Sequence, residues 1–273
     1  MALPRRAVVA AAWCCTVANA LAPAPQTNAP RLWLGDDRAA DAASVWELSP
    51  AQHRYVATVM RLREGDALRC FGAAMGEWAC AVETTTRRGT TVAAAVQTRP
   101  PPGAETPRLE LYFAPLRKKR TSLLIEKAVE LGATRLAPVK TERVERASLA
   151  ALGAGIHASA VEAAEQCERL RVPVVEEVVD LASPLGDLPL FVCAERADGA
   201  SPRLLDALLG AELGDGAALL VGPEGGFSDA DLAAVRASNP DATFVSLGAG
   251  ILRAETACWA GLAVAAAALG RPR

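Results

Sequence analysis

A glycine-rich loop between an apolar strand and a helix is the strongest candidate for a binding site in this sequence of 273 residues. Residues 222–226, Gly-Pro-Glu-Gly-Gly, follow the apolar run 219–221, and Ser228 and Asp231 form the Ser-x-x-Asp pattern that begins a helix. Ligands of open α/β sheets bind where strands end, and a helix N-terminus presents unpaired N–H groups. The loop has neither the GxGxxG pattern nor the Gly-Lys-Ser/Thr of a P-loop, so dinucleotide and nucleoside-triphosphate sites are not supported. A simple turn would show the same glycines.

A second loop of small residues follows downstream. The strand-like residues 243–247 lead into residues 248–250, Gly-Ala-Gly, and Arg253 and Glu255 lie at the entry of an alanine-rich helix over residues 254–269. Charged residues at that position would also serve simply to cap an apolar helix. Two strand–loop–helix segments of this kind predict a cleft at neighbouring strand ends.

The elements that carry these loops belong to the second of two predicted domains. Three consecutive prolines at residues 100–102 mark the boundary, because they continue neither a helix nor a sheet ladder. Strand-like and helix-like segments then alternate, which predicts a mostly parallel sheet with helices on both faces. The strand-like segments are 109–113, 136–139, 172–175, 190–193, 218–221 and 243–247, and the helix-like ones are 121–131, 148–170, 204–209, 229–237 and 254–269.

The first domain, residues 31–99, contains short β-like segments separated by Gly, Asp and charged turns. These segments are 31–34, 45–48, 67–71, 77–82 and 91–96. One helix interrupts them, with Ser49 as the N-cap and Pro50 at the first helical position, and it runs to a turn at residues 64–66. The pattern predicts a small barrel.

The net charge of −2 gives no indication of a polyanionic partner, but its distribution does. Residues 31–146 carry 19 Lys and Arg against 14 Asp and Glu, whereas residues 147–273 carry 8 against 17. A nucleic-acid surface is therefore expected in the first half of the chain, because phosphate attraction depends on local positive charge. No metal site is expected, since no His, Cys, Asp or Glu cluster has ligand spacing and the two histidines, His53 and His157, are far apart in the sequence.

The first 30 residues have the layout of a targeting leader. Arg5 and Arg6 precede an apolar run at residues 7–15 and small residues at 18–20, which is too short to span a bilayer as an anchor. The remaining cysteines are odd in number and lack CxxC spacing, so they are expected to be free and mostly buried rather than disulfide-bonded: Cys70, Cys80, Cys167, Cys193 and Cys258. A leader on a reduced protein fits an organelle, and the pattern resembles the bipartite presequences of algae with complex plastids. A mitochondrial or cytoplasmic location, or a terminus without an address, is the alternative.

The two loops together resemble the paired signature of the RsmE family of S-adenosylmethionine-dependent uridine-N3 methyltransferases. The likeness rests on residues 222–226 with Ser228, on residues 247–248, and on residues 251–253 with 255–256. Earlier segments agree in order, and the resemblance covers about residues 31–269. These segments are residues 53–66, Lys127 with 130–132, Pro138 with 142–143, and 165–167 with Arg169 and 172–173.

The resemblance implies a small PUA-like β-barrel (residues 31–99) followed by an α/β, SPOUT-type parallel sheet with a C-terminal trefoil knot (residues 100–273). It also implies a homodimer that acts on small-subunit ribosomal RNA or the assembled small subunit. S-adenosylmethionine would be bound by Val221, Gly222, Glu224, Gly226, Leu247, Gly248, Ile251 and Leu252. RNA phosphates would be contacted by Arg54, Arg61, Arg63, Arg117, Lys118, Lys119 and Arg120, although a solvated helix face explains the first three equally well.

The implied reaction requires uridine N3 to lose its proton, so a cation near the carbonyl oxygens of the base would stabilise the uridylate. Arg253 is the leading candidate, and Glu255 would be either a general base or the residue that orients Arg253. Tyr55 and Phe71 are candidates to stack on a base or are core residues. The alternatives are a different SPOUT RNA methylase, acting on transfer RNA or on ribose oxygen, and a non-catalytic RNA-binding assembly factor.

The sequence departs from the usual pattern of the family at several positions. The chain has Ala249-Gly250 where a Pro-Arg pair is usual and Ala254 where a threonine is usual. It also lacks the usual glycine in the turn at residues 117–120, and Glu168 stands where the family has a small residue. With these changes the second loop lacks any contact that the usual arginine and hydroxyl make.

Overall fold

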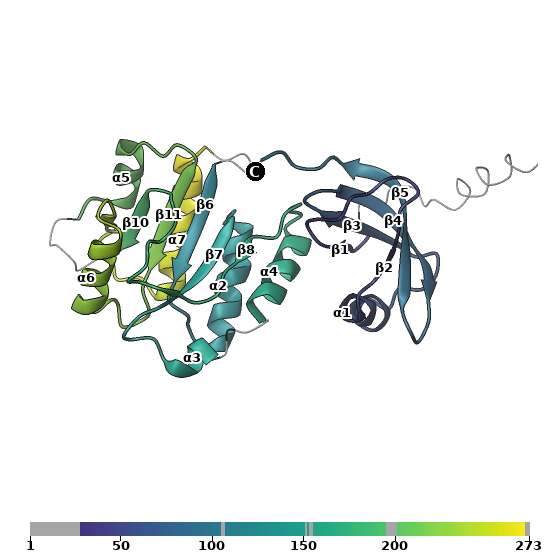
Figure 1. Ribbon diagram of the computed structural model, residues 1–273, viewed down its shortest axis with the longest axis horizontal. Helices are drawn as coiled ribbons and strands as arrows, with labels where there is room; N and C mark the ends of the chain where they lie inside the picture. Colours follow the sequence, from purple (N-terminus) through teal and green to yellow (C-terminus); the bar gives the residue numbers. More distant parts are fainter. Residues whose placement is uncertain (1–27, 105–106, 151, 153–154, 195–200, 271–273) are drawn as a thin grey trace, which may run out of the picture. The chain divides into compact units, whose positions relative to one another are not determined.

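The chain divides into two compact units between Pro102 and Gly103 in a computed structural model (Figure 1). The structure describes residues 28–104, 107–150, 152, 155–194 and 201–270. Each unit is described by itself. The predicted leader lies almost entirely outside the described residues.

Unit 1 is built on a five-stranded sheet with the order β1-β3-β4-β5-β2. Its strands are β1 (Arg31–Trp33), β2 (Val45–Glu47), β3 (Ala67–Gly72), β4 (Gly76–Thr85) and β5 (Thr90–Arg99). Strands β1 and β3 are parallel and the other pairs are antiparallel. The inward residues of the strands form one apolar core that includes Leu32, Leu68, Cys80, Val82 and Val92. All five segments expected to form strands do so.

The helix of unit 1 begins where the sequence predicts. Ser49 and Gln52 form a capping box, in which Ser49 Oγ accepts from Gln52 N at 3.3 Å and Gln52 Oε1 accepts from Ser49 N at 2.9 Å. Helix α1 (Pro50–Arg54) continues as a π-helix, η1 (Tyr55–Val59), instead of the regular helix expected from the sequence. The wider turn ends after Met60, whose N–H donates to Tyr55 O at 2.9 Å.

Unit 2 contains a wholly parallel sheet with the order β12-β10-β11-β6-β7-β8, and β9 also pairs with β7. Its strands are β6 (Arg108–Phe113), β7 (Arg135–Lys140), β8 (Val174–Val175), β9 (Val179–Asp180), β10 (Leu190–Cys193), β11 (Gly216–Val221) and β12 (Thr243–Val245). The central strands are continuously buried, as expected for a parallel sheet that is covered on both faces. The predicted α/β class with a parallel sheet is confirmed.

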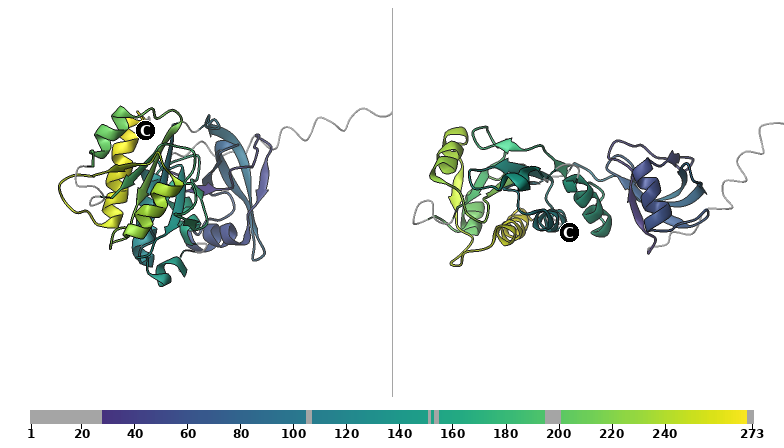
Figure 2. Two further views of the ribbon diagram at one scale, coloured as in Figure 1. Left: turned by 60° about the vertical axis from the view of Figure 1, so that its left-hand side comes forward. Right: turned by 90° about the horizontal axis from the view of Figure 1, so that it is seen from below.

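Helices cover both faces of this sheet (Figures 1 and 2). They are α2 (Lys118–Glu130), α3 (Arg146–Ala150), α4 (Gly155–Gln166), α5 (Leu204–Gly210), α6 (Asp229–Ser238) and α7 (Ala254–Ala268). Alternate residues of β11 face opposite ways. Leu220 packs in the core that contains Val235 of α6, whereas Leu219 lies so close to Gly261 of α7 that a Cβ there would come within 3.1 Å of it. Helix α7 also contacts α2 and α5, and α2 contacts α4.

One predicted helix proves to be two. The segment expected to be helical over residues 148–170 contains α3 and α4, separated by a stretch that is only partly described. Gly153 and Gly155 lie in or beside this stretch, and glycine disfavours a helix interior by about 1 kcal/mol relative to alanine. The second helix ends at Gln166, and Glu168 then adopts a φ of +60°.

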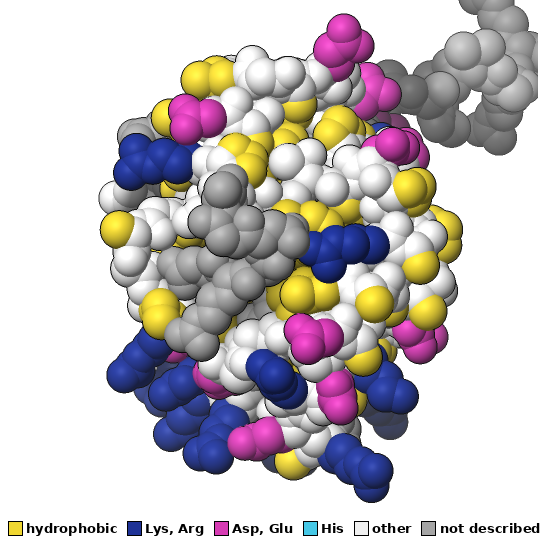
Figure 3. Space-filling view, turned by 90° about the vertical axis from the view of Figure 1, so that its left-hand side faces the viewer, with side chains coloured by type: hydrophobic (Ala, Val, Ile, Leu, Met, Phe, Trp, Pro, Cys, Tyr) yellow, Lys and Arg dark blue, Asp and Glu magenta, His cyan; other side chains and the backbone are white. Residues whose placement is uncertain are grey.

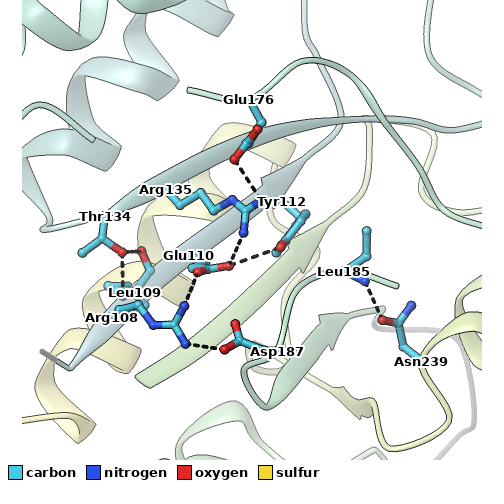
Figure 4. A network of polar contacts seen from close by, with 10 residues as sticks. All are labelled: Arg108, Leu109, Glu110, Tyr112, Thr134, Arg135, Glu176, Leu185, Asp187 and Asn239. Carbon is cyan, nitrogen blue, oxygen red and sulfur yellow. Dashed lines mark hydrogen bonds and ion pairs between the residues drawn. The ribbon is translucent and has the colours of Figure 1, made fainter. Parts of the chain in front are cut away.

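A network of polar side chains lies at the end of the sheet where β6 and β7 begin (Figure 4). Glu110 is 2% exposed and lies 3.5 Å from Arg108 and from Arg135, and it accepts from Tyr112 Oη at 3.2 Å. Burial and the Glu110 carboxylate raise the pKa of Tyr112 well above its ordinary value. Because Arg108 and Arg135 begin their strands, this network lies at the end of the sheet opposite to the carboxyl ends of the strands.

Candidate functional site

The segment from the end of β11 to the first turn of α6, residues 221–231, is here called the first junction. Helix α6 begins with the predicted cap: Ser228 N donates to Asp231 Oδ2 at 2.9 Å, and Asp231 N donates to Ser228 Oγ at 3.1 Å. Asp231 Oδ1 also accepts from Glu142 N at 3.0 Å, which ties this junction to the segment after β7. Gly226 has a φ of +69°, and a Cβ at Gly222 would come within 3.0 Å of the Phe227 ring. The backbone conformation therefore favours glycine at position 226, whereas at position 222 a side chain would press on the Phe227 ring.

The segment from the end of β12 to the first turn of α7, residues 245–255, is here called the second junction. Ser246 Oγ accepts from Gly248 N at 3.2 Å, and Gly248 has a φ of +136°. Helix α7 begins with Arg253 in the N-cap position, but no side chain caps it. Ile251, at 73%, is the most exposed of the large apolar side chains that the structure describes. The N–H groups at the start of α7 therefore lack the side-chain acceptor that Ser228 provides at the start of α6.

The two junctions line one cavity of about 280 Å³ at the carboxyl ends of β10, β11 and β12. It is lined by Arg143, Cys193, Ala194, Val221, Gly222, Pro223, Glu224, Gly225, Gly226, Phe227, Asp229, Leu232, Val245, Leu247, Ile251, Leu252, Ala254 and Ala257. Of the eight residues expected to bind a cofactor, only Gly248 is not in the lining. Two loops that are separated in the sequence therefore meet as the pattern predicts, at the edge of a parallel sheet where ligands bind.

The two residues with predicted catalytic roles lie beside this cavity and not in its lining. Arg253 is exposed and has no ion-pair or hydrogen-bond partner for its side chain within the part of the chain that the structure describes. Glu255 is 9% exposed, and its Oε2 is buried without a hydrogen-bond partner among those residues. Its Oε1 lies 3.9 Å from Arg120 Nε. The structure therefore pairs Glu255 with Arg120 of α2, and it shows no ion pair or hydrogen bond between the side chains of Glu255 and Arg253.

The basic residues 117–120, at the start of α2, do not all face the site: Arg120 contacts acids of the two junctions, whereas Arg117 does not. Arg120 Nη1 lies 3.4 Å from Glu224 Oε1, so this one side chain bridges an acid of the first junction and an acid of the second. Arg117 instead pairs with Glu145 at 3.2 Å, and its side chain is 78% exposed. Lys119 is exposed, whereas Lys118 begins α2 with a side chain that lies outside the described part of the structure. No pattern in the sequence indicates that Arg120 adjoins the site.

Arg143 is a cavity residue to which the sequence assigned no role. Its Nη1 donates to the carbonyl oxygen of Gly225 at 2.6 Å, across 82 residues of sequence. A Cβ at Gly225 would lie 3.3 Å from Arg143 Cδ, so the arginine stem covers this glycine closely. The only available signal was the occurrence of the pair Glu142-Arg143 in the family's order of motifs.

Burial keeps a thiol in the cavity lining neutral. It raises the pKa of Cys193 to about 12, and it raises the pKa of Cys258 well above its ordinary value. Within the described residues the five cysteines are free, and Cys70, Cys80 and Cys258 are buried, which confirms the prediction of free and mostly buried thiols. Within the part of the chain that the structure describes, no group of three or more His, Cys, Asp or Glu residues could hold a metal ion.

The three arginines of unit 1 that are expected to contact RNA are available to solvent. Arg54, Arg61 and Arg63 are all exposed around the end of the helix, and Arg61 has a φ of +57°. Phe71 is fully buried beneath the Arg31 guanidinium, which lies 3.9 Å from its ring centroid, so its expected alternative role in base stacking is wrong. Tyr55 is half-buried and packs against the core of the unit.

The surface charge is mixed on the face of the molecule that carries α5 and α6. Figure 3 shows lysine and arginine side chains in the lower part of this face, with acidic side chains among them and hydrophobic side chains near its centre. No helix within the described residues is long and apolar enough to cross a membrane.

The sequence and the fold are similar to those of known RNA methyltransferases. The model of the RNA methyltransferase domain family matches residues 104–266. Ribosomal RNA small subunit methyltransferase E of Rickettsia conorii is 31% identical over 216 residues, which is 77% of this chain and 85% of the relative.

Two solved methyltransferase structures are similar to this chain in fold. A Legionella pneumophila methyltransferase structure in complex with bound cofactor SAM is 25% identical with a TM-score of 0.73, covering 88% of this chain and 98% of that one. Ribosomal RNA small subunit methyltransferase E from Neisseria gonorrhoeae, bound to S-adenosyl methionine, is 23% identical with a TM-score of 0.70, covering 88% and 97%. The latter likeness is one of fold. This chain belongs to the ribosomal RNA small subunit methyltransferase E family of RNA methyltransferases.

Proposed function

We propose that this protein transfers the methyl group of S-adenosylmethionine to N3 of a uridine in small-subunit ribosomal RNA. The observation that carries the proposal is the single cavity formed by the two junctions at the strand ends. The Rickettsia relative supports the small-subunit RNA, and the Legionella structure supports the cofactor. The uridine N3 position rests on the resemblance of the two loops to the RsmE signature.

The cavity fits the proposed cofactor in size and polarity. A volume of about 280 Å³ is close to the lower end of small-molecule sites, roughly 300 Å³. Apolar residues such as Leu247 and Leu252 alternate with the polar groups of the glycine-rich loop in its lining. When bound, the cofactor supplies an electrophilic methyl group on a sulfonium. The junction backbones would hold it, and the acids of the lining suit its positive charge.

The residues of the second junction would act on the RNA base. A uridine N3 must be deprotonated before it attacks, and Arg253 is an exposed cation without a partner in the described chain, so it is free to stabilise the developing negative charge on the base. Glu255 carries a buried oxygen without a donor, but its carboxylate lies toward Arg120. We assign Glu255 to hold Arg120 and the start of α7 rather than to take the proton.

We further propose that unit 1 is the PUA-like RNA-binding unit, with Arg54, Arg61 and Arg63 contacting phosphates. Their exposure supports this role.

We also propose that α7 is threaded as a trefoil knot and contributes to a homodimer. The solvent side of α7, at Ala260, Ala263, Val264 and Ala267, is apolar, which supports burial against a second copy. A monodisperse monomer in sedimentation at micromolar concentration would contradict the dimer.

The function is tested by incubating the purified protein with S-adenosylmethionine and unmethylated small-subunit ribosomal RNA, followed by nucleoside mass spectrometry. We expect 3-methyluridine at one position. A 2′-O-methylated nucleoside, or methylation only of transfer RNA, would contradict the proposed substrate. Absence of cofactor binding would instead indicate a non-catalytic assembly factor.

We propose that the leader at residues 1–30 directs the protein to an organelle, a plastid. A fluorescent reporter fused to residues 1–40 should enter the plastid of an alga with complex plastids. A diffuse cytosolic signal would contradict this.

A further inference from the structure

We propose that Arg143 binds the carboxylate of the methionine moiety of S-adenosylmethionine. The inference rests on the proposed function, because it takes the cofactor as the occupant of the cavity. It adds a binding residue from the segment after β7, which lies outside both junctions.

The geometry around Arg143 leaves most of its donors available at the cavity. One nitrogen, Nη1, donates to Gly225 O at 2.6 Å, and this bond holds the guanidinium over the glycine-rich loop. No acidic side chain pairs with Arg143 within the described ranges of the chain. A guanidinium has five N–H donors in a planar fork that suits a carboxylate, so an anchored but unpaired arginine is a preformed carboxylate site.

The charges in the lining complement those of the cofactor. Arg143 is the single Lys or Arg among the lining residues, and Glu224 and Asp229 are the two acids. S-adenosylmethionine carries one carboxylate and two positive groups, its ammonium and its sulfonium. The one cation of the cavity therefore has one matching group on the cofactor.

Neighbouring cations do not have this placement. Arg146 lies three residues further on, exposed and outside the cavity lining. Arg120 is occupied by Glu224 and Glu255, and Arg253 is also outside the lining. Arg146 is therefore a matched control for the loss of one positive charge near the site.

The test compares equilibrium binding of S-adenosylmethionine and its decarboxylated form, which keeps the sulfonium and the amine but lacks the carboxylate. Calorimetry would give the affinity of each ligand for the wild type, Arg143→Gln, Arg143→Lys and Arg146→Gln. We expect the wild type to prefer S-adenosylmethionine by roughly tenfold or more, the size of a charge-assisted hydrogen-bond pair. Arg143→Gln should remove this preference, Arg143→Lys should keep part of it, and Arg146→Gln should keep all of it.

The possible results separate the inference from the proposed function. If Arg143→Gln weakens both ligands equally, the arginine only braces the Gly225 loop, and the inference is wrong. If it changes neither affinity but weakens RNA binding, Arg143 contacts a phosphate, and the inference is again wrong. If the wild type binds neither ligand, the proposed function itself fails.

Discussion

The first and second junctions have the same order of strand, small-residue loop and helix, but they differ in how their polar groups are satisfied. In the first, the Ser228 and Asp231 side chains close both ends of a capping box. In the second, Arg253 occupies the N-cap without a side-chain bond, and Glu255 retains a buried oxygen without a partner. Satisfied caps stabilise a fold, whereas an exposed cation without a partner in the described chain, such as Arg253, is available to a ligand beside the cavity. We therefore propose that the first junction is the cofactor platform, and that the second, which also lines the cavity, presents Arg253 to the substrate.

The largest effect should follow from Arg253→Ala. Removing one preorganised cation should lower the methylation rate roughly a hundredfold. The melting temperature and cofactor affinity should hardly change, because the side chain has no partner in the described chain. Raising the pH should partly rescue the variant by supplying uridylate directly, and Arg253→Lys should keep part of the rate. Joint loss of stability and cofactor binding, without rescue by pH, would show that Arg253 instead braces the second junction.

A smaller effect should separate Arg120 from Arg117. Arg120→Gln leaves the Glu255 side chain, which is 12% exposed, without its cation, so the free energy of unfolding should fall by about 1–2 kcal/mol. Arg117→Gln breaks only an exposed pair and should change it by less than about 1 kcal/mol. Conversely, only Arg117→Gln should make the salt dependence of RNA binding shallower. If the two variants change the salt dependence of RNA binding equally, Arg120 also contacts RNA phosphates.

The caps offer a still smaller, matched comparison. Ser228→Ala and Ser49→Ala each remove a capping box, so each should lower stability by about 1 kcal/mol in a denaturation experiment. Only Ser228→Ala should also weaken cofactor binding, because Ser49 lies in the other unit. If both variants bind the cofactor as the wild type does, the first junction is a structural turn and not a platform.

The smallest expected effect is an absence of reaction at Cys193. Its pKa, raised by burial to about 12, keeps the thiol protonated at pH 8, and only the thiolate attacks an alkylating reagent. Mass spectrometry after brief alkylation of the native protein should therefore find Cys193 unmodified, although it lines the cavity. Rapid modification that the cofactor blocks would show a more open cavity than the one described.

Local features of the sequence predicted most of the fold. The start of α6 follows from a pattern spanning four residues, and β6 and β11 follow from apolar runs. The π-helical turn η1 could not be predicted, because it depends on how the helix packs on the core of unit 1. The periodicity does not predict the division into α3 and α4, although Gly153 lies between the two helices and Gly155 begins the second.

The site was predictable only where its residues lie on the strand-ending loops. Parallel strands bring their carboxyl ends together, so two such loops could be expected to meet. The partners of these loops come from elsewhere: Arg120 meets Glu224 across 104 residues, and Arg143 meets Gly225 across 82. No periodicity encodes such contacts, because they are set by the packing of α2 and by the course of the chain after β7.

Hydrogen–deuterium exchange with and without S-adenosylmethionine tests most directly whether both junctions form one cofactor site. At a cofactor concentration of about 100 times the dissociation constant, binding should raise the free energy of unfolding by about 2.7 kcal/mol. We predict slower exchange in peptides covering residues 221–231 and residues 245–255, with no change in the strands of unit 1. Protection of only one junction, or of unit 1 alone, would contradict a shared cavity.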